Sequence, residues 1–393
     1  MSFFPREKKG TQQRALKKRQ SVLQQWQPGK YQELFETPFD VERAGSRNCE
    51  NLVGSVAIPL GVAGPVKIQA TCLTGEYLLP LATTEGALVA SVNRGLKAIN
   101  EAGGVQILSR KIGMSRAPVF NCQTIENAAN LALRLQEKIL QKQLQKWAEE
   151  TSQHLQLKEL QSWQRGPLLY LRLVFNTDEA MGMNMVSVAT QKIAEELEKK
   201  FSQVELVSLS SNVCVDKKTS AINQLFGRGY AIQASVKLSE KIIQTVLKTS
   251  AAEIFRVHHY KNLVGSNVAA SLEQNMQVAN VVTAFFLATG QDPAHVVEAS
   301  QASVFMEVQR KSLFLALTAN NLNLGTVGGG TWLPAQSQAR SLIAQGKNLS
   351  AQELAEVLAA AILAAELSGA AALASQSLAR AHQRLGQGKG QNA

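Results

Sequence analysis

Hydrophobic and polar positions along the chain predict both strands and helices. Residues 50–70 are rich in Gly, Pro and Val, which favours strand and turn over helix. Residues 83–102 carry apolar positions at helical spacing, and Thr83 or Thr84 could cap the start of that helix. The continuous apolar run at 168–175 predicts a buried strand. The chain therefore mixes the two element types from an early point.

The middle of the chain predicts a small α+β unit. Around the strand at 168–175, short apolar runs alternate with longer stretches of helical periodicity. A strand-helix-strand-helix-strand order of this kind is typical of an α+β domain. The elements expected are a strand at 119–122, a long helical stretch at 124–162, a helix at 183–202 and a strand at 204–209.

The last third of the chain is expected to be mainly helical after residue 235, apart from a Gly-rich turn at 325–330. The apolar run at 354–374 approaches the length of a membrane span. However, Glu356 and Glu366 fall within it, and charges inside a bilayer are costly. We therefore expect this run to be a close-packed internal helix.

The chain length sets the domain organisation. With 393 residues, the protein exceeds what one compact core usually holds, so more than one structural unit is expected. We predict an α+β fold in which a large helix-and-sheet domain is interrupted by a small domain. The predicted limits are a helical basic N-terminal segment at 1–45, a large domain at 46–116 and 209–385, a small domain at 117–208 and a disordered tail at 386–393.

The net charge of +11 allows two interpretations. It could indicate a nucleic-acid or membrane-surface partner, or small anionic ligands such as nucleotides and coenzyme A. Much of the excess lies in the first twenty residues, where seven Lys and Arg face the single acid Glu7. Without that basic arm the chain is only mildly basic, so we favour small anionic ligands and expect neither nucleic acid nor membrane as a partner.

The four cysteines argue against a metal centre. Cys49, Cys72, Cys122 and Cys214 show no CxxC spacing, so neither a zinc nor an iron–sulfur site is expected, and we predict no metal. Scattered cysteines in a chain of this size suggest free thiols in a reducing compartment. The N-terminus has no apolar signal-peptide region, and we expect a cytoplasmic protein.

Three polar motifs could carry chemistry, although each has an ordinary structural interpretation. The pair Lys217-Lys218 after Asp216 could be a solvated surface, or could aim an ammonium at a developing oxyanion. Glu85 could be a helix-dipole partner, or a buried carboxyl of raised pKa that acts as a general acid. Asp292 follows Gly-Gln in an ordinary turn sequence, or could lie beside the lysine and the glutamate.

Three further motifs suggest ligand contact. The glycines at 325–330 allow a backbone to approach a ligand closely, although their spacing is not that of the dinucleotide fingerprint. The methionines at 180–185 are core filling, or line a flat ring where a strand turns into a helix. His382, late in a helix, is a dipole partner or a catalyst.

Taken together and in order, these motifs resemble the hydroxymethylglutaryl-coenzyme A reductase family. The resemblance runs from about residue 45 to residue 382, nearly the whole folded chain. The stretches that carry it are ENLVGSVAIPLGVAGPV, TTEGALVASVNRG, GMSRAPV, AMGMNM, DKKTSAIN with GRG, KNLVGS, GQDPA, GTVGGGT and AELSGAAALA.

The resemblance implies roles for individual positions. Glu85 matches the family's general acid, Lys217 the residue that polarises the thioester carbonyl, Asp292 the carboxylate linking these two, and His382 the acid that protonates departing coenzyme A. The positions matching substrate-binding residues are Glu50, Asn51, Arg116, Ser210, Asn212, Asp216, Lys218 and Lys261. Those matching cofactor-binding positions are Ser152, Glu179, Met181, Gly182, Met183, Asn184, Gly325, Thr326, Val327, Gly328, Gly329 and Gly330.

The resemblance also implies a fold and a reaction. The small domain is expected to be ferredoxin-like and to bind the nicotinamide cofactor. The expected reaction is the NADPH-dependent reduction of hydroxymethylglutaryl-CoA to mevalonate and free coenzyme A, in a homodimer or higher oligomer whose sites form between subunits. The Asp-Lys-Lys loop resembles class I members, and the membrane anchor of many eukaryotic members has no counterpart here. Alternatives are an NAD-dependent mevalonate-oxidising enzyme of the same fold and a non-catalytic CoA-thioester-binding protein.

Several positions depart from the family's pattern. Glu179 stands where an aspartate is usual, beside the expected nicotinamide, and Gln153 stands where mammalian members have an arginine that could pair with the NADP 2′-phosphate. Gln277 replaces a family histidine, and Tyr260 replaces an asparagine. We therefore expect NADPH as the cofactor, with NADH possible.

Overall fold

A computed structural model describes residues 11–26, 29 and 31–376 of the chain. His382 and the tail predicted at 386–393 lie outside the described residues, as does most of the basic arm.

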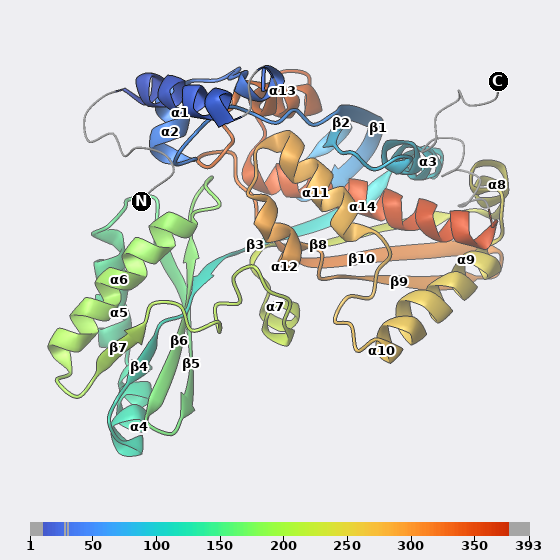
Figure 1. Ribbon diagram of the computed structural model, residues 1–393. Coiled ribbons are helices and arrows are strands. Elements are labelled where there is room, and N and C mark those ends of the chain that lie inside the picture. Colours follow the sequence, from blue (N-terminus) through green and yellow to red (C-terminus); the bar gives the residue numbers. More distant parts are fainter. Residues whose placement is uncertain (1–10, 27–28, 30, 377–393) are drawn as a thin grey trace.

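One sheet of ten strands runs through the molecule, in the order β7-β4-β6-β3-β8-β10-β9, with β1 beside β3, β2 beside β1 and β5 beside β6. The long strand β3 belongs to both halves, because it pairs with β8 and β1 at its start and with β6 at its end. Figure 1 shows it passing from the large domain into the small one. The strands are β1 (Leu60–Ala70), β2 (Thr74–Ala82), β3 (Val105–Arg116), β4 (Val119–Asn121), β5 (Gln156–Arg165), β6 (Leu168–Asn176), β7 (Glu205–Ser208), β8 (Gly229–Leu238), β9 (Ala302–Gln309) and β10 (Ser312–Leu322).

The small domain is ferredoxin-like, as expected. Its four strands lie in the order β7-β4-β6-β5 with every neighbouring pair antiparallel. Helices join β4 to β5 and β6 to β7, which gives two interlocked split β-α-β units. Its core is separate from that of the large domain and is built mainly of Leu, Ala and Phe. The helices are α4 (Ile125–Arg134), α5 (Lys138–Glu149) and α6 (Met183–Lys200).

A buried helix, α14 (Ala351–Ala374), forms the centre of the large domain. Its Ala- and Leu-rich sequence favours helix, and Ser350 and Glu353 form a capping box at its start. A helix that is apolar all round must be enclosed, and nearly every residue of α14 is buried. It is long and apolar enough to span a membrane, but 89% of that span is buried inside the protein. The predicted internal helix is therefore confirmed.

Helices α3 (Leu88–Glu101) and α11 (Val278–Thr289) pack beside α14 over one face of the sheet (Figure 1). The remaining helices lie at the edges and in the connections. They are α7 (Ala221–Phe226), α8 (Glu240–Ile242), η2 (Ile243–Leu247), α9 (Ala251–Val257), η3 (His258–Gly265), α10 (Ser266–Val268), η4 (Pro293–His295), α12 (Val296–Ala299) and α13 (Pro334–Ile343).

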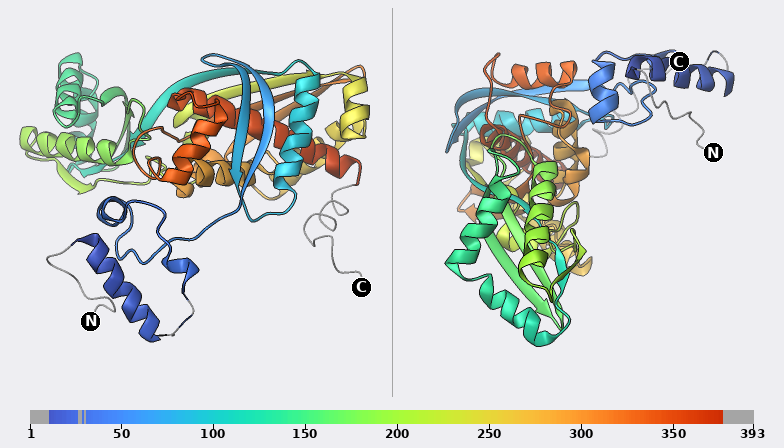
Figure 2. Two further views of the ribbon diagram at one scale, coloured as in Figure 1. Left: turned by 90° about the horizontal axis from the view of Figure 1, so that it is seen from above. Right: turned by 90° about the vertical axis from the view of Figure 1, so that its left-hand side faces the viewer.

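The N-terminal segment stands beside this body and contacts it through a small cluster of its own (Figure 2). It contains α1 (Gln12–Trp26), η1 (Glu33–Phe35) and α2 (Val41–Arg47). Leu16 packs with Val41, Ala44 and Leu52, and the cluster reaches Trp332 of the large domain. An extended stretch then leads into β1.

Two secondary-structure predictions were wrong. The helical stretch expected at 124–162 is two helices followed by strand β5, because β5 pairs along its length with β6, and this pairing outweighs a polar sequence with little strand character. The mainly helical region expected after residue 235 contains β9, β10 and the end of β8. These strands alternate buried and less buried positions, since only one face of the sheet is covered.

Candidate active site

Lys217 and Asp292 form an ion pair, with 2.8 Å between Lys217 Nζ and Asp292 Oδ2. Lys217 lies on the loop between β7 and α7, and Asp292 caps the start of η4 by accepting the Ala294 N–H. The loop backbone is unusual, because Lys217 and the β-branched Val215 both have positive φ, at 57° and 48°. Such conformations cost energy and persist where their surroundings enforce them. The sequence prediction that these two residues meet is confirmed in its geometry.

Several contacts act on the charge of Asp292. Partial burial favours the neutral carboxyl and would raise its pKa, but hydrogen bonds from Lys217 and the Ala294 N–H, with the nearby His295, lower the pKa of Asp292 below its usual value. Asp292 therefore stays ionised beside Lys217 at neutral pH. An ionised partner 2.8 Å away holds the lysine ammonium in one orientation.

Beneath this pair lies a buried polar network centred on Arg228, whose side chain is fully buried. Arg228 Nη1 donates to Glu298 Oε1 at 2.7 Å, and Nη2 donates to Asp216 Oδ1 at 2.9 Å. Its Nε donates to Ser115 Oγ at 3.1 Å. The guanidinium thus connects the Asp216 loop to β3 and to α12.

His295 extends the network to the Lys217–Asp292 pair. Its Nδ1 lies 2.7 Å from Glu298 Oε1, and its Nε2 lies 3.7 Å from Asp292 Oδ2. Asn323 also donates to Glu298 Oε1, at 2.8 Å. Sequence reasoning missed Arg228, His295, Glu298 and Asn323. Arg228 stands in a stretch that carried the resemblance, but no local pattern marks a charged residue as buried.

Asp216, His295 and Glu298 have the residue types of a metal site and offer ligand atoms within 4.8 Å of one another. The Arg228 guanidinium already contacts both carboxylates. A cation placed among the three would therefore lie against a fixed positive charge. The arrangement fits an arginine-centred network better than a metal centre.

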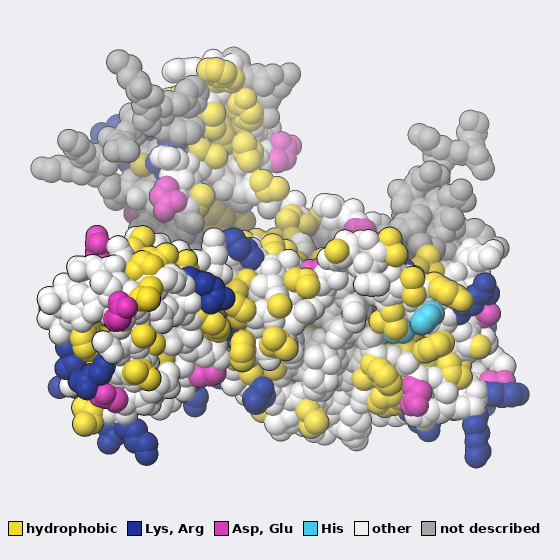
Figure 3. Space-filling view, turned by 90° about the horizontal axis from the view of Figure 1, so that it is seen from below, with side chains coloured by type: hydrophobic (Ala, Val, Ile, Leu, Met, Phe, Trp, Pro, Cys, Tyr) yellow, Lys and Arg dark blue, Asp and Glu magenta, His cyan; other side chains and the backbone are white. Residues whose placement is uncertain are grey.

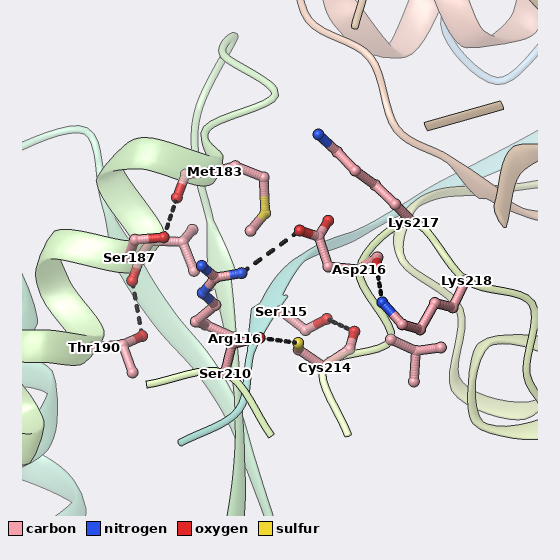
Figure 4. A network of polar contacts seen from close by, with 12 residues as sticks. Ser115, Arg116, Met183, Ser187, Thr190, Ser210, Cys214, Asp216, Lys217 and Lys218 are labelled. Carbon is pink, nitrogen blue, oxygen red and sulfur yellow. Dashed lines mark hydrogen bonds and ion pairs between the residues drawn. The ribbon is translucent and has the colours of Figure 1, made fainter. Parts of the chain in front are cut away.

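Four of the predicted substrate-binding residues gather near Asp216 (Figure 4). Arg116 Nη1 lies 3.5 Å from Asp216 Oδ2, and Lys218 Nζ lies 3.5 Å from the Asp216 carbonyl. Ser210 Oγ lies 3.4 Å from Cys214 Sγ. Figure 4 shows the side chains of Lys217 and Lys218 leaving the loop in different directions. Asn212, exposed and at a positive φ of 65°, is on the same loop.

Within one chain, Glu85 lies away from the Lys217–Asp292 pair. Its side chain is exposed and accepts a hydrogen bond from Asn280 Nδ2 at 3.1 Å, at the start of α11. Asp292 follows the other end of that helix, which places it about 14 Å farther along at 1.5 Å per residue. The expected burial of Glu85 beside Asp292 is therefore wrong for a single chain. Local sequence could not reveal this, because the separation depends on the length and direction of α11.

Other predicted substrate residues are also spread over the surface. Lys261 is exposed on η3. Burial raises the pKa of the nearby Glu366, and the charge of Lys261 partly opposes that rise. Glu50 and Asn51 are exposed in the turn after α2. Their neighbour Asn48 donates to the Gly329 carbonyl at 3.0 Å and accepts from Trp332 Nε1 at 3.2 Å. Glu50 and Asn51 thus adjoin the glycine-rich loop.

The two predicted cofactor motifs lie side by side. Ala180 and Val327 form a parallel β-bridge, and a Cβ added to Gly325 would come within 2.4 Å of the Met181 nitrogen. On the other side, the buried Gln291 exchanges two hydrogen bonds with Gly325, at 2.9 and 3.0 Å. The glycine-rich loop thereby joins the Met183–Lys200 helix to the turn that carries Asp292.

Glu179 has a structural role in this junction. Its Oε2 accepts hydrogen bonds from Thr326 Oγ1 at 3.0 Å and from the Ala351 N–H at 2.7 Å. The carboxylate therefore ties the motif to the glycine-rich loop and to the start of α14. The extra methylene compared with aspartate is taken up by these contacts.

Gln153 lines a cavity of about 480 Å³ in the small domain, and Ser152 precedes it in the chain. Ser152 Oγ points to Met185 Sδ at 3.7 Å, which connects this turn to α6. The cavity is lined by Glu149, Gln153, His154, Leu155, Gln156, Asn176 and Asp178. His154 Nδ1 lies 3.1 Å from Asp178 Oδ2. The carboxylates of Glu149 and Asp178 thus line the same cavity as Gln153, the position at which mammalian members are expected to have an arginine.

Comparison with known proteins decides the family. The profile of the family described as "Hydroxymethylglutaryl-coenzyme A reductase" matches residues 15–387. The chain belongs to the hydroxymethylglutaryl-coenzyme A reductase family.

Curated relatives agree with this membership. The chain is 43% identical over 346 residues to "3-hydroxy-3-methylglutaryl-coenzyme A reductase" of Pyrococcus abyssi, covering 86% of this chain and 85% of that protein. It is 44% identical over 355 residues to the protein of the same name from Haloferax volcanii, covering 88% and 87%. Both relatives carry the name of an oxidoreductase.

A solved structure supports the fold. A class II 3-hydroxy-3-methylglutaryl-CoA reductase from Streptococcus pneumoniae, bound to NADPH in open conformations, aligns with a TM-score of 0.66 at 21% identity. The alignment covers 93% of this chain and 98% of that chain. The class I-like interpretation of the Asp-Lys-Lys loop finds no support in this comparison, because the structural neighbour is a class II protein.

Proposed function

We propose that this protein reduces 3-hydroxy-3-methylglutaryl-CoA to mevalonate and coenzyme A, with NADPH as the electron donor. The observation that carries the proposal is the Lys217–Asp292 pair, held 2.8 Å apart at the edge of a buried polar network. The relatives named as reductases support the same reaction. The protein's cytoplasmic location is part of this proposal.

Lys217 is the residue that meets the developing negative charge. When the thioester carbonyl is attacked, its oxygen becomes an oxyanion, and a preoriented ammonium stabilises that charge more in the transition state than in the ground state. The same need returns when the aldehyde is reduced. Asp292 holds the Lys217 ammonium in place by the ion pair. Arg116 and Asp216 form an ion pair at 3.5 Å and would orient the polar acyl group of the substrate.

The two glycine-bearing motifs fit a nicotinamide dinucleotide. The N-terminus of α6 begins at Gly182 without a side-chain cap, so its free N–H groups can meet phosphate. A Cβ at Gly328 would meet nothing within 4 Å, which leaves open space in front of the loop. The bound cofactor would supply hydride, while Met183, Asn184 and Thr326 would hold and orient it.

We further propose that a second copy of the chain completes each site. In one chain, Glu85 and the Lys217–Asp292 pair lie at opposite ends of α11, so the general acid must come from elsewhere. The extended stretch before β1 exposes Val56 and Ile58, at 78% and 38%, beside the exposed Leu60. An exposed apolar stretch is suited to contact with a second copy of the same chain.

Turnover tests the reaction directly. We expect nicotinamide absorbance to fall when hydroxymethylglutaryl-CoA and NADPH are mixed with the protein, and Lys217→Ala to lower kcat about 10²-fold or more, as for loss of an oxyanion donor. Arg256→Ala, on an exposed helix, is the matched control and should keep full activity. Binding of the thioester without any turnover by the wild type would favour a CoA-thioester-binding protein. Faster oxidation of mevalonate with NAD would favour the reverse enzyme.

Cofactor preference needs its own measurement. NADPH is proposed although Glu149 and Asp178 line the cavity beside Gln153, where a cation for the 2′-phosphate would be useful. Gln153→Arg should lower the KM for NADPH and leave the KM for NADH unchanged. Steady-state rates with both cofactors at matched concentration provide the test, and a strong preference of the wild type for NADH would overturn the choice of NADPH.

A further inference from the structure

His295 is a buried imidazole beside the catalytic pair, and the motifs discussed above give it no role. Its side chain is 1% exposed. Charged groups face it from three segments: Asp292 and Glu298 from its own, Asp216 from the loop before α7 at 3.9 Å, and Arg228 from the start of β8 at 3.4 Å. Lys217 is bound to the Asp292 oxygen that His295 approaches.

The orientation of the ring follows from its partners. Glu298 Oε1 also accepts from Arg228 and Asn323, so this oxygen acts as an acceptor and Nδ1 carries the proton given to it. A histidine fixed through one nitrogen presents the other in a set direction. Here Nε2, which has no hydrogen-bond partner, faces Asp292 Oδ2 at 3.7 Å.

Asp292 is therefore held at two atoms. Its Oδ1 accepts the Ala294 N–H at 3.0 Å, and its Oδ2 lies between Lys217 Nζ and His295 Nε2. Rotation of the carboxylate would move the oxygen that aims Lys217. Glu298 and Arg228 hold the buried imidazole ring in place, and the ring in turn restricts rotation of the Asp292 carboxylate.

We propose that His295 is a positioning residue for the reduction, setting the orientation of Asp292 and through it the Lys217 ammonium. The inference rests on the proposed function and deepens it. Because it acts on the oxyanion donor rather than on substrate contacts, its loss should appear in kcat and leave the KM for the thioester nearly unchanged.

Two substitutions separate the ring nitrogens. His295→Asn keeps a donor near the Nδ1 position and removes the group that faces Asp292, whereas His295→Gln places an amide near the Nε2 position. We expect His295→Asn to lower kcat about 10- to 100-fold, the scale of an ångström of misplacement, with KM changed less than about 3-fold. His295→Gln should recover most of the lost kcat. Val297→Ala, on the short helix α12 that follows His295, controls for disturbance of α12 and should keep the wild-type kcat.

Steady-state kinetics of the intact protein, with thermal unfolding of each variant, distinguish the outcomes. Equal loss of kcat in the Asn and Gln variants, or wild-type kcat in His295→Asn, would overturn the positioning role. If His295→Asn does not fold, Glu298→Gln replaces it, since it weakens the acceptor that orients the ring; unchanged kcat there would also overturn the role. Absence of turnover in the wild type would instead refute the proposed function, and the inference with it.

Discussion

At the scale of single residues, the site depends on charges that are removed from water. Arg228 and Glu298 are both fully buried and 2.7 Å apart, and each has further polar partners. Burying a charge is costly unless it is paired and hydrogen-bonded, so every member of the network relies on the others. The loop carrying Lys217 is held in its positive-φ conformation by this buried network, through Asp216.

Removal of Arg228 should destabilise the whole protein. Arg228→Met keeps much of the side-chain volume but leaves Glu298 and Asp216 without their buried cation. We expect the free energy of unfolding to fall by about 3–5 kcal/mol, the usual result when one partner of a buried pair is removed. Urea denaturation measures it. Arg256→Met is the control, because its pair with Glu253 is largely exposed and should contribute less than about 1 kcal/mol. Equal losses in the two variants would contradict the argument.

At the scale of elements, α14 organises the large domain. Its two internal carboxyls, which count against a membrane span, accept hydrogen bonds from neighbouring segments. Glu366 accepts the N–H groups of Met276 and Gln277 at the start of α11, and Glu356 accepts the Cys72 N–H at 3.1 Å. Gln277 also donates to the Ala365 carbonyl. The departure from the family histidine at 277 is thus accommodated by contact with α14.

Glu366 should make stability depend on pH. Burial raises the pKa of Glu366 to about 7, against the lowering effect of the N–H groups and Lys261. Because the folded state then holds a proton that the unfolded state releases near pH 4.5, the free energy of unfolding falls as pH rises from about 4.5 to 7. The contribution is about 3 kcal/mol. Urea denaturation at pH 5 and pH 7.5 should show this decline relative to Glu366→Gln; parallel pH dependence of the two proteins would refute it.

The contact between helices α3 and α14 should tolerate no added side-chain carbon at Gly95. A Cβ on Gly95 of α3 would lie 2.0 Å from the Ala364 carbonyl oxygen of α14. Gly95→Ala must therefore separate the helices, and we expect a loss of about 1–3 kcal/mol in the free energy of unfolding, measured by urea. Gly45→Ala on α2 is the matched control. Its Cβ would meet only the flexible end of Gln12, so it should be neutral or slightly stabilising.

At the scale of the whole molecule, the central question is how Glu85 reaches Lys217. The described part of one chain holds no hydrogen bond or ion pair between Glu85 and the Lys217–Asp292 pair. Figure 3 shows the molecule from below, where basic side chains are dispersed over both domains among acidic and apolar ones. The described residues on this face therefore form no single basic patch of the kind that nucleic acid would favour.

Shared sites predict complementation between inactive variants. Glu85→Gln and Lys217→Ala should each be nearly inactive alone. If a site takes Glu85 from one subunit and Lys217 from the other, a mixed dimer has one intact site, and mixing the two variants should restore up to about a quarter of wild-type activity. Subunits are exchanged in mild denaturant and then assayed. No recovery, despite mixed dimers detected by a purification tag, would show that each site lies within one chain.

The same model predicts that activity depends on association. Val56→Asp places a charge on the exposed apolar stretch before β1 and should shift the protein toward monomers with a parallel loss of turnover. Light scattering coupled to size exclusion measures the mass. Val188→Asp is the control, since Val188 is similarly exposed, at 59%, but lies on α6 of the small domain. A monomeric Val56→Asp protein with full activity would contradict the shared site.

The sequence by itself determined the family, the internal helix α14 and the identity of the pair Lys217 and Asp292. These follow from short stretches of consecutive residues, which can be recognised without knowing how the chain folds. Only the tertiary structure decided that Glu85 lies at the far end of α11, that Glu179 ties together three segments, and that Arg228, His295 and Glu298 form one buried network. The physical reason is that burial and pairing of charges depend on residues far apart in the sequence, such as Glu179 and Ala351, 172 positions apart, which no local pattern connects.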